Sequence, residues 1–184
     1  EISALRAVAD LANKVSRERA PANKVMSSTP EELAKNLQEL QAHRKEVDIQ
    51  IDQTIQILNA AGFSAQVRGL SSNLKVTLQQ GRHAVDAYAA LPRSERTSKQ
   101  LDDAIKKMFT AWDSCHEILK NVLLHSVGKG TSASESYTLI LILADLRDQA
   151  GRIASNVIAS VTFAEKIPED NLARSLQTQH QANY

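Results

Sequence analysis

Apolar residues recur at alternating steps of three and four along most of this chain. That spacing places the apolar side chains on one face of an α-helix. Proline, glycine and short polar segments divide the pattern into separate stretches, because these residues stop or start helices. The pattern therefore predicts helices over residues 1–28, 30–62, 65–91, 98–127, 132–166 and from 169 onward.

The second predicted helix has the clearest boundaries. Thr29 suits the capping position, Pro30 suits the first helical position, and Glu32 places negative charge in the first turn. Gly62 predicts the C-terminal cap of this helix. Farther along, Gly128-x-Gly130 lacks the preceding strand and the third glycine of a dinucleotide-binding loop. We interpret that segment as a turn.

The three–four spacing predicts an all-α fold, an elongated antiparallel bundle of long helices. At about 1.5 Å per residue, helices of about 30 residues would be about 45 Å long and would form a rod. The most regular apolar seam, in 98–127, comprises Leu101, Ile105, Met108, Trp112, Cys115, Leu119 and Val122. The seam of 132–166 comprises Leu139, Leu143, Leu146, Ala150, Ile153 and Val157. Such a seam is covered either within the bundle or across a homodimer, and the pattern leaves both open.

Composition narrows the class of protein. The chain has 184 residues, of which 42% are hydrophobic and 4% aromatic, so it can bury a core but lacks the aromatic content typical of β-sandwiches. The formal net charge is +1 and no basic run exceeds two residues, which argues against nucleic acid as a partner. The longest apolar run, 139–144, is much shorter than the roughly 18 residues of a membrane span.

The two ends of the sequence suggest a piece of a longer protein. The first residue is Glu1 rather than methionine, and the last predicted helix has no glycine or proline stop before Tyr184. We expect one helical-bundle module over 1–166 and the start of a further helix over 167–184. A second helical module stacked on the first would account for the unterminated helix.

Charged residues interrupt the seams of the first two helices. Arg19 takes a seam position with Glu18 beside it, and Arg44 takes one in the second helix. Charges at such positions are costly to bury unless they are paired or bound to something. One interpretation is a Glu18–Arg44 ion pair. The other is that Arg19 and Arg44, helped by Asn23, bind a small anion between the helices.

Further departures from the pattern concern Pro21, Gly81 and the fifth helix. Pro21 predicts a kink in the first helix because it removes a backbone hydrogen bond. Gly81 on the third seam predicts close approach of a neighbouring helix. Asp148 and Arg152 are spaced as an exposed i, i+4 ion pair. Alternatively, Arg147 and Arg152 line a cleft and form a second anion site.

Catalytic and metal sites find little support. Asp113 with His116 and Glu39 with His43 have helical spacing, but no Glu-x-x-His segment occurs, so a bundle di-metal centre is not predicted. Cys115 is the only cysteine and lies on a seam, which favours a buried apolar role over a nucleophile or zinc ligand. We expect no catalytic residue, no metal and no cofactor.

Three segments together resemble the extracytoplasmic helical regions of bacterial transmembrane receptors. They are Val15-Ser-Arg-Glu-Arg-Ala-Pro-Ala-Asn23, Ala42-His-Arg44-Lys-Glu-Val47-Asp48 and Leu146-Arg147-Asp148-Gln-Ala-Gly151-Arg152. Such regions are the input domains of methyl-accepting chemotaxis receptors and of diguanylate cyclases. The resemblance covers roughly residues 1–165 in pattern and order, with Ala20 where glycine is common in the first segment.

The resemblance implies a periplasmic four-helix-type bundle between two spans of the inner membrane. It also implies a small-molecule ligand, often a carboxylate or another small anion, bound between helices or at a homodimer interface. Binding would shift a helix or a dimer equilibrium and pass a signal to a cytoplasmic output domain. We therefore expect a sensor domain without enzymatic activity. The rival hypothesis is a cytoplasmic scaffold rod resembling vinculin or talin bundles, which would bind partner proteins.

Overall fold

The computed structural model describes residues 2–127 and 134–182, and among these it contains helices and no β-strand. The elements are α1 (Ile2–Ser27), α2 (Pro30–Ala60), α3 (Ser64–Gly69), the π-helical η1 (Leu70–Leu74), α4 (Lys75–Ala90), the 3-10 turn η2 (Arg93–Glu95), α5 (Ser98–Val127), α6 (Ser134–Phe163) and α7 (Glu169–Ala182). The predicted all-α fold is confirmed. The turn predicted at Gly128-x-Gly130 and the predicted start of a helix at 132 lie outside the described residues.

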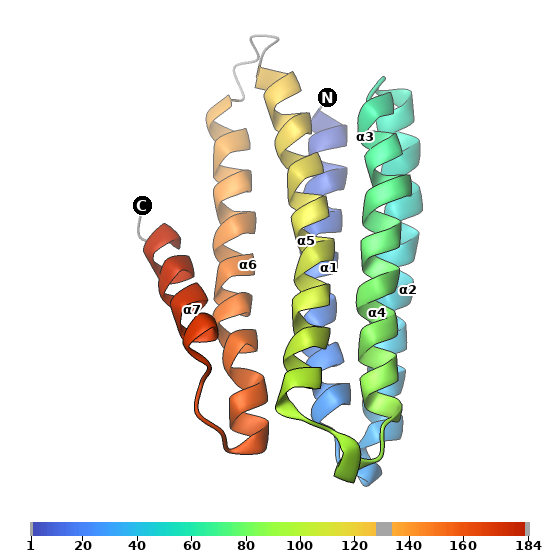
Figure 1. Ribbon diagram of the computed structural model, residues 1–184. Helices are drawn as coiled ribbons and strands as arrows, with labels where there is room; N and C mark the ends of the chain where they lie inside the picture. Colours follow the sequence, from blue (N-terminus) through green and yellow to red (C-terminus); the bar gives the residue numbers. More distant parts are fainter. Residues whose placement is uncertain (1, 128–133, 183–184) are drawn as a thin grey trace.

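The long helices run alongside one another (Figure 1). α1 packs against α2, α4, α5 and α6, so it occupies the centre of the bundle. α6 packs on α1 and α5, and α7 packs on α6. Successive long helices run in opposite directions, which confirms the predicted antiparallel arrangement.

The helix ends follow the predicted capping residues where the sequence signal is strong. α2 begins at Pro30, and the Thr29 backbone N–H donates to the Glu32 carboxylate at 3.1 Å. After α2, Gly62 adopts a left-handed φ of 81°, as a glycine cap does. α6 ends at Phe163, three residues earlier than predicted, because Ala164 takes the left-handed conformation, with a φ of 51°, and the Glu165 N–H returns to the Ser160 carbonyl.

A π-helical segment in the third predicted helix was not anticipated from the sequence. α3, η1 and α4 follow one another without a break, and the Lys75 N–H donates to the Leu70 carbonyl, five residues back. Leu70 and Leu74 are both fully buried. A single widened turn thus keeps both leucines on the core side of the helix.

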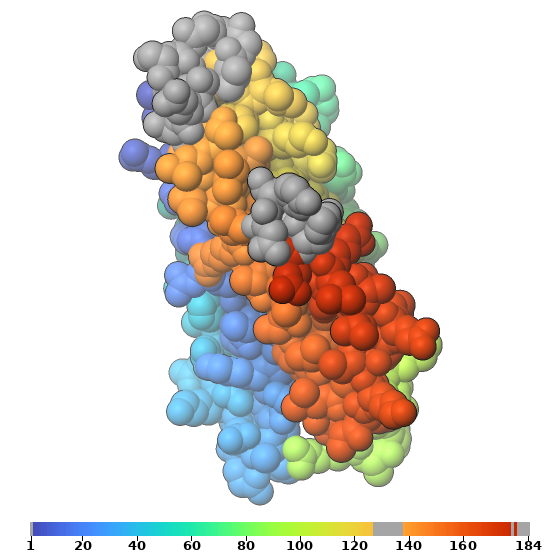
Figure 2. All heavy atoms as spheres, turned by 90° about the vertical axis from the view of Figure 1, so that its left-hand side faces the viewer, coloured from blue at the N-terminus to red at the C-terminus, as the bar shows by residue number. Residues whose placement is uncertain are grey.

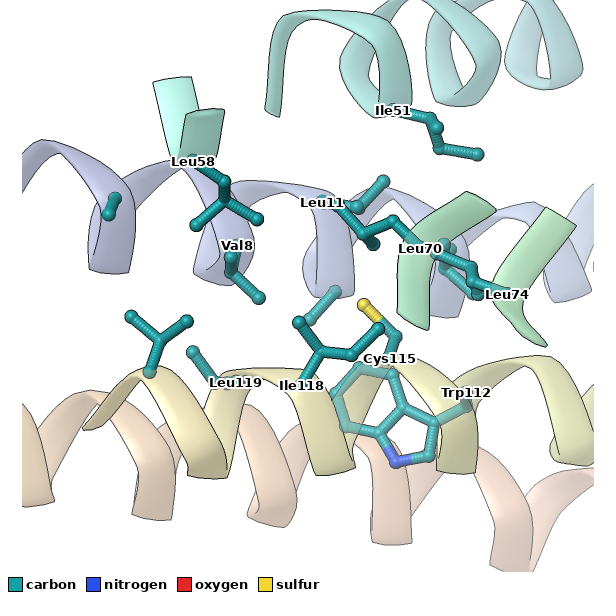
Figure 3. Packing of buried hydrophobic residues seen from close by; sticks show 14 of the residues in the cluster. Val8, Leu11, Ile51, Leu58, Leu70, Leu74, Trp112, Cys115, Ile118 and Leu119 are labelled. Carbon is teal, nitrogen blue, oxygen red and sulfur yellow. The ribbon is translucent and has the colours of Figure 1, made fainter. Parts of the chain in front are cut away.

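The apolar core is divided into two clusters. The first surrounds Leu11, Leu58 and Leu119, and Figure 3 shows side chains from α1, α2, η1 and α5 meeting there. The second lies toward the α1–α2 turn and includes Met26 and Ile105. Between them, α1 presents Ser16, Glu18 and Arg19, all buried.

Gly81 confirms the predicted close approach between helices. A Cβ at this position would lie 3.3 Å from the Lys107 carbonyl oxygen and 3.4 Å from the Met108 Cα. Both atoms belong to the backbone of α5, so neither can move aside cheaply. Glycine therefore allows α4 and α5 to pack backbone to backbone at this level.

The seams of α5 and α6 have different surroundings. In α5 every seam residue is buried. In α6, Leu139 and Leu143 are each 56% exposed and Leu146 is 41% exposed. The buried side chains of α6 are mostly polar or small and comprise Asp148, Gln149, Ser155, Asn156, Ala159 and Ser160. Figure 2 shows that α6 and α7 form much of one face of the molecule.

Candidate functional site

A layer of buried charged residues lies between the two apolar clusters. It begins with Glu18 and Arg19, two neighbouring residues of α1 that face different helices. Consecutive residues of an α-helix are about 100° apart around its axis, so Glu18 and Arg19 diverge. Glu18 faces α2 and α4, where Arg82 donates from Nε to its Oε1 at 2.9 Å and from Nη2 to its Oε2 at 2.7 Å. Arg19 faces α6, where its Nη2 lies 2.6 Å from the Asp148 Oδ1.

Arg44 contributes to the Glu18 side of this layer. Its Nε lies 3.7 Å from the Glu18 Oε1, which confirms the predicted ion pair. The shorter bonds of Arg44, however, are donated to the two Asp86 oxygens at 2.8 and 2.9 Å. Arg82 and Asp86 were missed by the sequence interpretation, although their i, i+4 spacing on the third helix was a usable signal.

Arg19, Asp148, Arg152 and Asp113 form an ionic chain that joins α1, α6 and α5. Arg152 donates to the Asp148 and Asp113 carboxylates, each at 2.5 Å. Both guanidinium groups lie over the Phe109 ring, with centroid distances of 5.3 Å for Arg19 and 4.7 Å for Arg152. The predicted Asp148–Arg152 ion pair is present. The prediction that this pair is exposed is wrong, because Asp148 is only 2% exposed.

Burial has opposite effects on the two ends of the Arg19–Asp148 pair. Desolvation raises the pKa of the Asp148 carboxyl, and the positive charges of Arg19 and Arg152 oppose that shift. Desolvation also lowers the pKa of Arg19, against the pull of Asp148. The pair therefore depends on its own short contacts to remain charged inside the bundle.

The space between Arg19 and Arg44 is too small for an anionic ligand. Both residues border a void of about 10 Å³, which has room for about one water molecule. Each guanidinium is already held by a carboxylate of the chain. The structure thus places these two predicted ligand residues at one void but gives them separate, internal partners.

A larger groove runs between α1 and α6. One half has a volume of about 390 Å³ and is mainly apolar. Its lining includes Leu5, Ala9, Asn13, Trp112, Ile140, Leu143 and Ala144. The other half is also about 390 Å³, is more polar, and includes Arg17, Arg19, Asn23, His43, Gly151 and Ser155. Ser16 and Arg147 line both halves, so the groove is continuous past these two residues.

Three of the five predicted ligand residues, Arg19, Asn23 and Arg147, therefore line one groove. Neither half of this groove includes Arg44 or Arg152, whose guanidinium groups are held in the two ionic networks. Trp112 and Arg17 were missed as lining residues. Arg17 stands in the first of the three resemblance segments, but its direction toward α6 depends on how α1 packs.

Two arginines of the groove have no carboxylate partner among the described residues, and Glu39, the carboxylate that lines the polar half, pairs with Lys24. Arg147 is exposed and forms no ion pair or hydrogen bond with another described residue, and the same holds for Arg17. Burial lowers the pKa of Arg147, and the nearby charge of Arg17 lowers it further. Arginine nevertheless stays protonated at neutral pH, so two like charges face each other across the polar half.

Several polar atoms around the groove lack a partner among the described residues. They are Asn13 Oδ1, Arg19 Nη1 and Asn23 Oδ1, all buried at the atom level. Pro21 adds to them because it has no N–H, which leaves the Arg17 carbonyl without its helical donor. Asn23 itself spans the groove, since its Nδ2 donates to the Ser155 hydroxyl at 3.4 Å.

The candidate metal residues have other contacts. Asp113 pairs with Arg152, Glu39 pairs with Lys24, and His116 lies against the Trp112 ring at a centroid distance of 5.9 Å. Within 2–127 and 134–182, no three histidine, cysteine, aspartate or glutamate side chains are grouped to hold a metal ion. Cys115 is fully buried in the first apolar cluster.

Comparisons with protein-family models, with curated proteins and with solved structures found no match to this chain. Among the described residues, no helix has both the length and the apolar character that crossing a membrane requires.

Proposed function

We propose that this chain is the extracytoplasmic sensor domain of a bacterial inner-membrane receptor, and that the α1/α6 groove binds a small anion or carboxylate. The observation that carries the proposal is Arg147, whose guanidinium stands where the two halves of the groove join and has no ion-pair partner among the described residues. Arg17 reinforces it, because an anion between the two groups would relieve their mutual repulsion. The proposal includes no catalytic step, no metal and no cofactor.

A ligand in this groove would act on α6 relative to α1. The two helices are joined by the Arg19–Asp148 pair and the Asn23–Ser155 hydrogen bond. The apolar residues that α6 packs against the first cluster, Ile140, Leu141 and Ala144, are only partly buried. Binding shifts an equilibrium between helix positions only by the difference in affinity for the two positions. A ligand that contacts both α1 and α6 would bind one relative position of the two helices more tightly than another.

The outer face of α6 supports a homodimer as the route of transmission. Its seam is uncharged over Leu139, Leu143, Leu146 and Ile153, which are 37–56% exposed. A two-fold axis beside α6 would set this seam against its own copy, and the spacing suits helix packing at small angles. Ligand-dependent movement of α6 would then reach the second copy directly.

The same face favours a second candidate function. Leu172 and Leu176 of α7 are 48% and 57% exposed and extend the apolar character of α6. A cytoplasmic scaffold would use such a surface to bind a partner protein and would need no groove ligand. Loss of partner capture on Leu146→Glu, with no response of the protein to any anion, would favour this function.

A thermal-shift screen against organic acids, amino acids and inorganic anions tests the sensor proposal. A cognate ligand at 100 to 1,000 times its Kd should add about 2.7 to 4.1 kcal/mol to the free energy of unfolding and raise Tm. Arg147→Gln should remove the shift, whereas Arg68→Gln removes an exposed arginine on α3, outside the groove, and should not. If no anion raises Tm, or if Arg147→Gln keeps the shift, the proposed groove function is wrong.

A further inference from the structure

The two halves of the α1/α6 groove differ in chemistry as well as in position. The half that contains Trp112 is walled by aliphatic side chains and an indole ring. The half that contains Asn23 is walled by arginine, amide, hydroxyl and imidazole groups and by the Glu39 carboxylate, which pairs with Lys24. Arg147 stands at the boundary, so one positive charge is placed at the mouth of an apolar chamber. Figure 3 shows the Trp112 ring extending from α5 on the side nearer α6.

We infer that the ligand of this groove is an amphipathic monocarboxylate, whose apolar body lies in the Trp112 half and whose carboxylate binds Arg147. This inference rests on the proposed function, since it assumes that Arg147 binds an anion. At about 30 Å³ for each water-sized group, the 390 Å³ chamber takes a body of at most about thirteen non-hydrogen atoms.

The apolar half favours a body that excludes water. Leu5 and Trp112 form a nearly inaccessible wall, each 2% exposed, whereas Ile2 and Leu143 stand at the open side with more than half of each side chain exposed. An alkyl or aryl body would cover these exposed atoms and gain from their removal from water. A small, fully polar anion would make no use of this half.

Charge at the apolar end favours a single carboxylate. Arg6 and Asp10 line that half together, and their charges offset each other. A second carboxylate at the far end of the ligand would therefore find no net positive charge to receive it. The unpaired guanidinium groups lie at the other end of the ligand, where Arg147 and Arg17 can donate charge-assisted hydrogen bonds to one carboxylate.

Trp112 is the only tryptophan of the chain and reports on this half of the groove. We would titrate the intact 184-residue chain with octanoate and decanoate below their critical micelle concentrations and follow tryptophan emission. Acetate, succinate, phosphate and octanol serve as probes that lack either the apolar body or the single carboxylate. We expect saturable binding of octanoate or decanoate at least tenfold tighter than of any other probe.

Two variants separate the roles of charge and shape. Arg147→Gln should weaken octanoate binding at least tenfold, and Arg68→Gln should leave it unchanged. Ala144→Phe should fill the apolar half and weaken decanoate at least tenfold while leaving acetate binding at Arg147 intact. If Ala144→Phe does not fold by circular dichroism, Ala9→Leu tests the same half from α1.

The outcomes distinguish this inference from the proposed function. If acetate, succinate or phosphate binds as tightly as octanoate and Arg147→Gln abolishes that binding, the groove is an anion site and the amphipathic ligand is wrong. If octanol matches octanoate and Arg147→Gln changes nothing, both the anion site and this inference are wrong. Decanoate binding that survives both Ala144→Phe and Ala9→Leu would also overturn the inference.

Discussion

α5 and α6 are helices of 30 residues each with the same three–four apolar spacing, but they use it in opposite ways. The α5 seam contains Leu101 and Leu119, both fully buried, and joins α1 and α4. The α6 seam contains Leu139 and Leu143, both more than half exposed. α6 instead turns Asp148 and Ser155 toward α1, and Asn156 toward α7.

This difference shows what periodicity specifies. A three–four pattern identifies the apolar face of a helix but does not identify what covers it. In α6 a second, polar face has exact partners on α1 and α5, and those short ion pairs and hydrogen bonds decide the side that packs inward. The first four long helices thus place their seams in the apolar core, whereas α6 adds buried ion pairs and hydrogen bonds to the partly buried apolar contacts that it makes.

Removing Asp148 should have the largest effect on the α6 attachment. Asp148→Ala leaves Arg19 buried without its carboxylate, and loss of one partner of a buried pair costs about 3 to 5 kcal/mol. Urea denaturation measures this change in the free energy of unfolding. Replacing both partners, as Arg19→Met with Asp148→Leu, should recover most of the loss, because no buried charge is left unpaired. A double variant as unstable as Asp148→Ala would contradict the ionic account.

A matched pair of leucine truncations compares the two seams directly. Leu119→Ala in α5 should cost about 2 to 5 kcal/mol because it leaves a cavity in the first apolar cluster. Leu146→Ala in α6 should cost less than about 1 kcal/mol in the monomer, since that side chain is already 41% exposed. Chemical denaturation at low protein concentration gives both values. Equal costs would mean that the α6 seam is covered in solution.

The proposed dimer makes the α6 seam sensitive to charge. Leu146→Glu should weaken self-association at least tenfold, which is about 1.4 kcal/mol, because two like charges would meet across the two-fold axis. Lys120→Glu on the exposed side of α5 is the control and should leave association unchanged. Sedimentation over a concentration series measures the effect. A chain that is monomeric at every concentration, before any substitution, would remove the dimer from the proposal.

The smallest effect at neutral pH concerns Cys115 within the α5 seam. Burial raises the pKa of its thiol from an ordinary 9.0 to about 12, so at pH 8 about one thiol in ten thousand is ionised. The folded chain should therefore resist iodoacetamide at pH 8 and react once unfolded. Because the folded state holds this proton more tightly, its contribution to stability should fall as the pH rises from 9 toward 12. Rapid alkylation of the folded chain would show that the α5 seam opens.

The sequence was sufficient for local features and insufficient for partners across the bundle. Thr29, Pro30 and Gly62 determine helix ends through their own backbone preferences, so the boundaries of α2 were predicted closely. Ala164 has no such signal, because its left-handed conformation comes from hydrogen bonds to the preceding turn. The end of α6 was accordingly placed too late.

The candidate site was predicted in part for the same reason. Charged residues on or beside apolar seams are visible in a sequence, which is how Arg19, on a seam, and Arg147, flanking one, were found. The rotation of α6 about its axis decides which carboxylate neutralises Arg19. It also decides that no carboxylate among the described residues neutralises Arg147. The wall formed by Trp112 likewise requires α5 to pass behind the α1/α6 contact.

The neighbouring positions of Glu18 and Arg19 also determine how the bundle deforms. Rotation of α1 about its axis would separate Glu18 from Arg82 and Arg19 from Asp148 at the same time. Two ion pairs therefore oppose this rotation. Tilting α6 away would break the Arg19–Asp148 and Asn23–Ser155 contacts and leave the Glu18–Arg82 pair in place. α1 is therefore constrained from two sides, whereas α6 can tilt against it without disturbing the Glu18 pairs.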